Sequence, residues 1–440
     1  MGKVKMPLIS SGGGGKFEVP NGAAIPCFGS TEIEAATFIE TVNAGGGEQV
    51  FIPSFSGYPN PVLLANATTV VWLYNNYFYA GKLNGSQITA GTGAYFYNAH
   101  FFDVMMNGTR AIVYQQESSG YTNAGLFSIN GTSVSQIASF GDDNHWTFTG
   151  PDGRGFCKVS ESQAISWQSG YSGGYKTYLM FMDISSGSFN YSNFELFNNY
   201  SSQVTTRAIK GCFLNNYLVL VEVRDVTYVH VFTVSGVKLT KVSTTKVSDN
   251  QWGISTNIVP ISANKAVMVT CENQSTEPMR ITTLTLSGST PSVTHLTFGP
   301  TGNYAYGYAS TPSSQGPGFA VSDSKIYVAC GVRGMSFTNA IQFYTFDIND
   351  GVVSLSDSKD LTLVSPSQMY AGHNAVIVDG LPVFGINASG TTTGGVTTNN
   401  GPAIIRNFGR YEVKPATTKI DGITSDKISP TKSGTVWYLK

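Results

Sequence analysis

The five histidines are the first residues to consider for metal or acid–base chemistry, and they are scattered: His100, His145, His230, His295 and His373. A zinc site normally shows paired ligands such as H-E-x-x-H, which place two imidazoles on one side of the metal. No such pair is present. We therefore interpret these histidines as hydrogen-bonded strand residues, and we predict no metal site and no cofactor.

Carboxylates are the second group of candidate catalytic residues, because glycoside hydrolysis needs a pair of them that flank the scissile bond. The densest polar cluster is Gly141–Trp146, which could be a ligand loop or a solvated loop. Ser139–Trp146 has the span of the sialidase turn S-x-D-x-G-x-x-W, but Gly141 stands in place of the Asp and Asp143 in place of the Gly. Asp347–Gly351 lacks the spacing of a calcium loop. Because a G-x-S-x-G elbow and a P-loop are also missing, we predict that the chain is not an enzyme.

Aromatic residues in polar loops are more open to a binding role. Tyrosine among Gly, Ser and Asn forms adaptable contact surfaces and can stack on sugar rings. The alternative is that these rings wedge neighbouring sheets together. The candidate ligand or partner residues are Tyr95, Phe96, Tyr97, Trp146, Tyr171, Tyr175, Tyr304, Tyr306 and Tyr308.

The elements that must position these side chains form a sequence repeat, and each repeat contains two strand–turn–strand segments, called here the first and the second line. The first line is a strand, a polar turn and a continuously apolar strand. In the seven repeats, the first residue after this turn is Val70, Ala111, Ala164, Tyr217, Ala266, Ile326 and Leu381. Successive positions are separated by 41, 53, 53, 49, 60 and 55 residues. The second line is an apolar run broken by a glycine-containing turn, seen at Asn84-Gly85, Asn130-Gly131, Ser186-Gly187, Ser235-Gly236, Ser287-Gly288 and Asp350-Gly351. Such a repeat predicts an all-β fold, a β-propeller of seven four-stranded blades.

The two ends differ from the repeats. We expect a glycine-rich, extended N-terminal arm over residues 1–50, the propeller over 51–414, and a C-terminal β tail over 415–440. Within the arm, Glu32–Val42 is a candidate short helix. The arm is either a leader without order or an anchor that becomes ordered on a partner; the tail could be a small hairpin docking on the propeller or on a neighbour. We favour the anchor, because apolar residues recur among the glycines: Ile9, Phe17, Val19, Ile25 and Phe28.

Composition excludes several classes of function. The net charge is −1 and only 12% of residues are charged, about half of the ~25% usual in soluble domains. A broad nucleic-acid footprint needs clustered Lys and Arg, so we predict no nucleic-acid partner. No apolar stretch reaches the ~18 residues of a membrane span, and no secretory signal is expected. The five cysteines are odd in number and lack C-x-x-C, so we expect free core thiols.

Low charge, abundant Gly, Ser, Thr and Asn, and a Gly-rich arm (Ser10–Gly15) give the chain a general resemblance to bacteriophage virion proteins, especially tail-associated ones. Its C-terminal Ile420–Ile423 and Ser433–Val436 are similar to the short β tails of many phage tail and fibre proteins. The resemblance implies assembly into a particle and contact with a bacterial surface. It carries no catalytic residues.

We therefore expect a non-enzymatic structural protein of a phage tail or collar, present in several copies in a symmetric virion assembly. Its partners would be other virion proteins, reached through the arm and the tail. The propeller would dock on them or recognise a host-surface glycan or protein. One alternative is a lectin-like, carbohydrate-binding adhesin. Another is a glycan-degrading propeller enzyme whose acids come from non-repeated loops.

Overall fold

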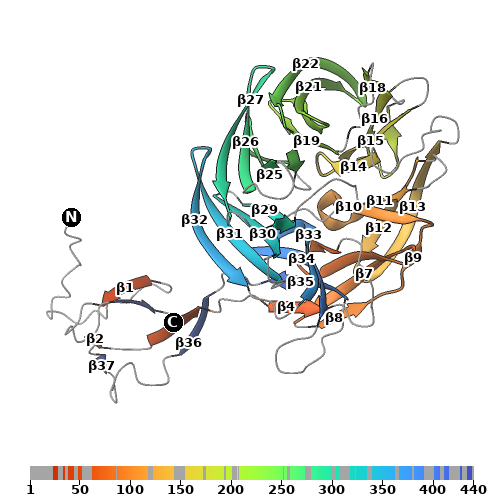
Figure 1. The fold of residues 1–440 in the computed structure, drawn as a ribbon. Coiled ribbons are helices and arrows are strands. Elements are labelled where there is room, and N and C mark those ends of the chain that lie inside the picture. The colour runs from red at the N-terminus through yellow and green to blue at the C-terminus, as the bar shows by residue number, and fades with distance from the viewer. Residues whose placement is uncertain are drawn as a thin grey trace, which may run out of the picture. The chain divides into compact units, whose positions relative to one another are not determined.

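The protein is described here from a computed structural model (Figure 1). It describes residues 23–27, 33–34, 38–43, 48–51, 62–85, 87–116, 122–142, 154–171, 175–192, 195–200, 206, 208–250, 252–254, 258–272, 279–299, 304–306, 318–322, 324–333, 339–361, 366–378, 381–390, 401–406, 411–415, 427–428 and 434–438.

Contacts divide the chain into two compact units. The terminal unit combines Met1–Gly47 with Phe408–Lys440, and the large unit spans Glu48–Asn407. These bounds differ from the expected ones at both ends, since residues 48–50 belong with the large unit and residues 408–414 with the terminal unit.

The large unit is propeller-like, because its strands form successive antiparallel sheets in which neighbours in sequence are neighbours in space (Figure 1). The first sheet has the order β5 (Val62–Asn66), β6 (Thr69–Tyr74), β7 (Tyr77–Asn84), β8 (Gln87–Ala90), and β9 (Ala94–Tyr95) also pairs with β7. The second contains β10 (Ala99–Met105), β11 (Arg110–Gln116), β12 (Thr122–Asn130) and β13 (Ser133–Asp142), with the 3₁₀ turn η1 (Met106–Gly108) between its first two strands. The third contains β14 (Arg154–Lys158), β15 (Gln163–Tyr171), β16 (Tyr175–Asp183) and β17 (Asn190–Tyr191), and β18 (Glu195–Tyr200) also pairs with β16.

The next sheets repeat the plan. The fourth is β19 (Ala208–Leu214), β20 (Tyr217–Val223), β21 (Thr227–Ser235) and β22 (Lys238–Ser248). Another is β23 (Trp252–Ile254), β25 (Lys265–Glu272), β26 (Met279–Ser287) and β27 (Thr290–Phe298), with β24 (Val259–Ser262) paired to β25. It is followed by β28 (Tyr304–Tyr306), β30 (Lys325–Arg333), β31 (Asn339–Asn349) and β32 (Val352–Leu361), with β29 (Gly318–Val321) paired to β30.

The last sheet of the large unit joins the two ends of that unit. Its order is β33 (Pro366–Val378), β34 (Leu381–Gly390), β35 (Gly401–Arg406) and β4 (Glu48–Phe51), so its outer strand precedes the first sheet in sequence. One hydrophobic cluster packs Leu64 and Trp72 of the first sheet against Val383 and Ile404 of the last. The last sheet is therefore completed by a strand from the start of the unit, and apolar packing joins it to the first sheet.

Local sequence explains the turns and the buried strands. The glycines of all six predicted second-line turns have positive φ, as the turn residues require: Gly85, Gly131, Gly187, Gly236, Gly288 and Gly351. The predicted apolar strands β6 and β20 are almost continuously buried. The core lies between neighbouring sheets; for example, Phe78 and Phe127 of the first two sheets meet edge to face at 5.4 Å.

The terminal unit brings the two chain ends together. Its four-stranded sheet has the order β1 (Ala23–Cys27), β38 (Gly434–Tyr438), β3 (Phe38–Asn43), β36 (Tyr411–Pro415), and β2 (Ile33–Glu34) pairs with β37 (Lys427–Ile428). Arm and tail, expected as separate segments, thus share one sheet.

The helix predicted over Glu32–Val42 is wrong where the structure describes that segment, because β2 and β3 occupy it. Ile39, Thr41 and Val42 are β-branched and favour extended backbone, and pairing of β3 with β36 and β38 supplies the hydrogen bonds that a helix would otherwise make. Within the described part of the chain the one helix is the three-residue η1, and no helix there could span a membrane.

Candidate functional site

A central cavity of about 600 Å³ is lined by the innermost strands of the successive sheets. Its walls come from β5, β10, the β14–β15 turn, β19, β24, β29 and β33, and are mainly apolar. Because the strands are antiparallel, the turns between first and second and between third and fourth strands emerge at one end of every sheet, called here the turn end. The connections between second and third strands and between sheets emerge at the other, the loop end.

The charged residues that line the cavity gather on two neighbouring strands and the turns that follow them. Lys158 Nζ pairs with the Glu161 carboxylate and donates to the Val104 carbonyl at 3.0 Å. Asp103 Oδ2 accepts from the backbone N–H of Lys158 at 3.3 Å. Glu161 Oε2 accepts from the Asn107 N–H at 2.7 Å. Both carboxylates therefore tie one strand or turn to the next.

The turn η1 at this edge of the cavity is strained. Met106 and Asn107 both have φ of 53°, in the left-handed region, and Gly108 follows with φ of 85°. Left-handed backbone costs a side-chain-bearing residue about 1–2 kcal/mol. Glu161 holds the turn from the next sheet, since its carbonyl accepts from Met106 N at 2.7 Å and its carboxylate from Asn107 N.

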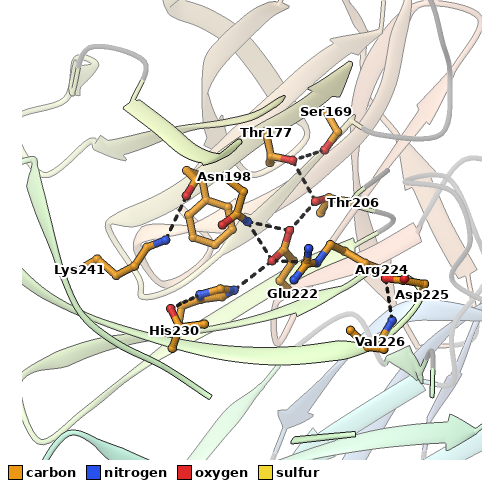
Figure 2. Close-up of polar contacts among 12 residues, drawn as sticks. Ser169, Thr177, Asn198, Thr206, Glu222, Arg224, Asp225, Val226, His230 and Lys241 are labelled. Atoms are coloured by element: carbon orange, nitrogen blue, oxygen red, sulfur yellow. Dashed lines mark hydrogen bonds and ion pairs between the residues drawn. The ribbon is translucent and has the colours of Figure 1, made fainter. Parts of the chain in front are cut away.

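A second polar constellation lies inside the protein between the third and fourth sheets (Figure 2). Its centre is the buried carboxylate of Glu222 on β20. Glu222 accepts from Asn198 Nδ2 at 2.9 and 3.0 Å, from Thr206 Oγ1 at 2.5 Å and from His230 Nε2 at 3.0 Å. Arg224 Nε lies 3.5 Å from Glu222 Oε2. The carboxylate is thus surrounded by donors from two sheets and the segment between them.

Outer members extend this constellation, which we call the Glu222 network. On one side Thr206 contacts Thr177 Oγ1 at 3.0 Å, and Thr177 contacts Ser169 Oγ at 2.7 Å. On the other, His230 Nδ1 lies 2.9 Å from Thr244 Oγ1. The Lys241 ammonium donates to the Phe197 carbonyl at 3.0 Å, and the Arg224 guanidinium lies 4.1 Å from the centre of the Tyr228 ring. The network joins the third sheet to the fourth across their interface.

Electrostatics keeps Glu222 ionised and His230 neutral. Burial alone would raise the pKa of Glu222, but the hydrogen bond from His230, the Arg224 charge and the Thr206 hydroxyl together lower it. Burial is the main cause that lowers the pKa of His230, helped by the charges of Lys241 and Arg224 and opposed by Glu222. A neutral His230 donates from Nε2 to Glu222 and accepts at Nδ1 from the Thr244 hydroxyl.

We expect the free energy of unfolding to fall as the pH is lowered. Below the ordinary histidine pKa of ~6.5 the unfolded chain protonates residue 230 while the folded chain does not, and below ~4.3 the same holds for Glu222. The unfolded state then binds more protons, so stability decreases with falling pH. Chemical denaturation at pH 8, 6.5 and 5 measures this slope. His230→Gln, which has no titrating group there, should flatten the decline between pH 6.5 and 5; an unchanged slope would contradict the assignment.

The predicted aromatic residues at positions 95–97 differ in their exposure to solvent. Tyr95 and Tyr97 are 54% and 56% exposed, whereas Phe96 between them is 9% exposed and packs edge-on against Phe127 at 5.6 Å. Phe96 therefore packs in the core and is not placed as a ligand residue, and its N–H donates to the Asn76 carbonyl in the neighbouring turn. Tyr77, which sequence reasoning did not single out, joins the surface at 38% exposed.

The other predicted residues are reported by backbone position alone. Tyr171 pairs with Tyr175 across the β15–β16 hairpin, and Tyr304 and Tyr306 lie in β28. Ile25 lies in β1 opposite Val436. The residues that lie outside the described part of the chain are Trp146, Tyr308, Ile9, Phe17, Val19 and Phe28.

The Glu222 network was missed at the sequence level, although a signal existed. Glu222 interrupts the apolar run 218–223, and His230 interrupts 229–232. A charged residue within a buried strand normally has a partner, so the two strands could have been matched. His230 and His295 are hydrogen-bonded strand residues, as predicted; His295 Nδ1 lies 2.9 Å from Thr282 Oγ1.

Two buried cysteines lie among the described residues, and neither thiolate chemistry nor metal binding is supported there. Cys157 and Cys212 are buried free thiols, and burial raises the pKa of each to about 12, so both stay protonated near neutral pH. In the same described residues no group of three or more His, Cys, Asp and Glu side chains is placed to hold a metal ion.

Comparison with models of protein families and with characterised proteins finds no match. Among solved structures, the chain is similar to a hypothetical selenium-binding protein from Sulfolobus tokodaii, with a TM-score of 0.47, 9% identity and coverage of 86% of this chain and 93% of that one. It is also similar to a proposed 6-phosphogluconolactonase from Bacteroides fragilis (TM-score 0.45, 11% identity, 89% and 97% coverage). A third similar structure is a proposed 6-phosphogluconolactonase from Bacteroides uniformis, with a TM-score of 0.46, 9% identity and coverage of 82% of this chain and 95% of that one. Likenesses of this size assign neither a family nor an activity to the chain.

Proposed function

We propose that the chain is a non-enzymatic structural component of a phage particle, in the tail or collar. The terminal unit anchors it, and a seven-bladed propeller docks on another surface or recognises the host. The single observation that carries the proposal is that the two chain ends pair with each other. The large unit is completed by β4 and needs none of the terminal strands, so the terminal sheet is available for another task.

Strand addition is the physical mechanism of anchoring. In the described terminal sheet β38 and β3 are central, while β1 and β36 each have a neighbour on one side only. An edge strand presents unpaired N–H and C=O groups that a neighbouring subunit can pair with. The predicted anchor residue Ile25 lies in β1, one of these edges.

Seven blades are proposed because the cavity takes one innermost strand from each sheet of the large unit: β5, β10, β14, β19, β24, β29 and β33. The cluster shared by the first and last sheets supports a closed ring. A non-enzymatic role is favoured because Asp103 and Glu161 in the cavity accept hydrogen bonds that hold neighbouring strands. The placement in a virion rests on the resemblance of the composition, the arm and the tail to phage proteins.

A proline in the central strand of the terminal sheet tests the anchor. Trp437 lies in β38 opposite Ala24 of β1 and Ile39 of β3. Trp437→Pro removes an N–H and its ring blocks pairing, so we expect loss of the sheet and of incorporation into particles. Co-sedimentation of the variant with particles measures incorporation.

The matched control is Trp437→Val, which keeps the backbone donor and a strand-forming side chain. It should be incorporated like the unchanged chain. Near-ultraviolet circular dichroism should show the large unit folded in both variants. Incorporation of Trp437→Pro at the normal level would overturn the anchoring role.

A further inference from the structure

Three exposed tyrosines lie at the loop end of the first sheet, a group that we call the tyrosine platform: Tyr77, Tyr95 and Tyr97. Tyr77 and Tyr95 are register partners on β7 and β9, with ring centres 5.2 Å apart and planes at 68°. Tyr97 follows two residues after Tyr95 and is more than half exposed. The rings of Tyr77 and Tyr95 therefore lie together beside the Asn75–Asn76 turn, and Tyr97 is exposed two residues further along the chain.

Core contacts hold this surface in place. Phe96, between Tyr95 and Tyr97, is inserted into the core, and its N–H donates to the Asn76 carbonyl at 2.7 Å. Tyr77 lies 6.0 Å from Tyr79, and Tyr79 stacks on the buried Trp72 at 5.5 Å with planes 8° apart. A surface that is ordered before binding loses less conformational entropy on binding.

The tyrosine platform has almost no charge around it in sequence. Between Glu48 and Asp103 the one Asp, Glu, Lys or Arg is Lys82. Lys82 lies on β7 opposite Thr69 and Thr89, near the turn end, away from the hairpin that carries Tyr77. An acidic ligand at the tyrosine platform would find no counter-charge on this sheet nearer than Lys82 towards the turn end, and a basic ligand would find no carboxylate on it.

Three asparagines lie in the turns next to these tyrosines in the sequence. Asn75, Asn76 and Asn98 all adopt left-handed backbone, with φ of 46°, 64° and 54°. Asn75 is exposed, and Asn76 and Asn98 are half-buried. An amide side chain offers both donors and acceptors, which match the hydroxyls of a sugar.

We propose that the tyrosine platform binds an uncharged glycan. A neutral pyranose combines apolar C–H faces, which suit exposed tyrosine rings, with hydroxyl groups, which suit amides. It carries no charge and so needs none from the protein. This inference deepens the surface-recognition role of the proposed function and rests on it, but its site is separate from the terminal sheet.

The full-length chain applied to an array of neutral and acidic bacterial surface polysaccharides tests the proposal. We expect binding to neutral glycans, with Tyr95→Ala and Tyr97→Ala each weakening it roughly tenfold, equal to the loss of one good ring contact. Tyr95→Phe keeps the ring and should retain binding. Tyr191→Ala, which removes a 42% exposed tyrosine from the third sheet, should leave it unchanged.

The proposal would be overturned by any of these outcomes: no neutral glycan bound at millimolar concentration, binding confined to acidic glycans, or binding to neutral glycans unaffected by Tyr95→Ala and Tyr97→Ala. Capture of a protein in place of glycans would also count against it. Failure here is distinguishable from failure of the anchoring role, because the Trp437 variants are read by incorporation and the tyrosine variants by glycan binding.

Discussion

Replacing Glu222 by alanine is expected to lower the free energy of unfolding by about 3–5 kcal/mol. The substitution removes the shared acceptor of Asn198, Thr206 and His230 and leaves the Arg224 guanidinium without its buried carboxylate neighbour. Buried donors that lose their acceptor each keep the full cost of their desolvation. Denaturant titration of the full chain measures the loss.

Two further variants separate the network from general effects of losing a glutamate. Glu195→Ala removes a half-exposed carboxylate from β18 and should change stability by no more than about 0.5 kcal/mol. Glu222→Gln keeps the shape but replaces an acceptor oxygen by a donor NH₂ facing other donors, so it should also be strongly destabilising. A loss below about 1 kcal/mol for Glu222→Ala would show that the network does not stabilise the contact between the two sheets.

Substituting Gly108 by alanine is expected to destabilise the protein by about 3 kcal/mol or more. A Cβ at Gly108 would lie 2.0 Å from the carbonyl oxygen of Ala65, which belongs to the neighbouring sheet, so the two sheets would have to separate. The left-handed φ of 85° adds backbone strain. Thermal unfolding of the variant tests the expectation.

Gly131→Ala is the matched control. Gly131 also has a left-handed φ, of 59°, but a Cβ there meets no atom within 4 Å. Gly131→Ala should therefore lower the free energy of unfolding only by the backbone strain, ~1 kcal/mol. Equal losses of unfolding free energy for Gly108→Ala and Gly131→Ala would show that the close contact between η1 and β5 contributes nothing to stability.

Much of the fold could be predicted because its signals are local. Gly131 and Gly288 sit in turns whose backbone geometry excludes most other residues, so the turn positions were visible directly. The exposure of Tyr95 and Tyr97 and the burial of Phe96 could not be predicted, because they depend on the pairing of β9 with β7 and on the hydrogen bond from Phe96 to Asn76. The segment Phe38–Asn43 shows the opposite case, because its strand depends on partners from residues 411–415 and 434–438.

The all-β repeat, the turn chemistry and the low charge could be predicted from the order of the residues, since they depend on composition and on residues close together along the chain. Which groups meet in space became known from the folded chain. It paired the two chain ends in one sheet, closed the last sheet with β4, placed Asn198 and Thr206 on Glu222, and left Tyr77 beside Tyr95. Such contacts join residues from different strands, sheets and loops, and their partners are selected by packing and by the cost of burying an unpaired polar group. Neither is visible in the order of the residues.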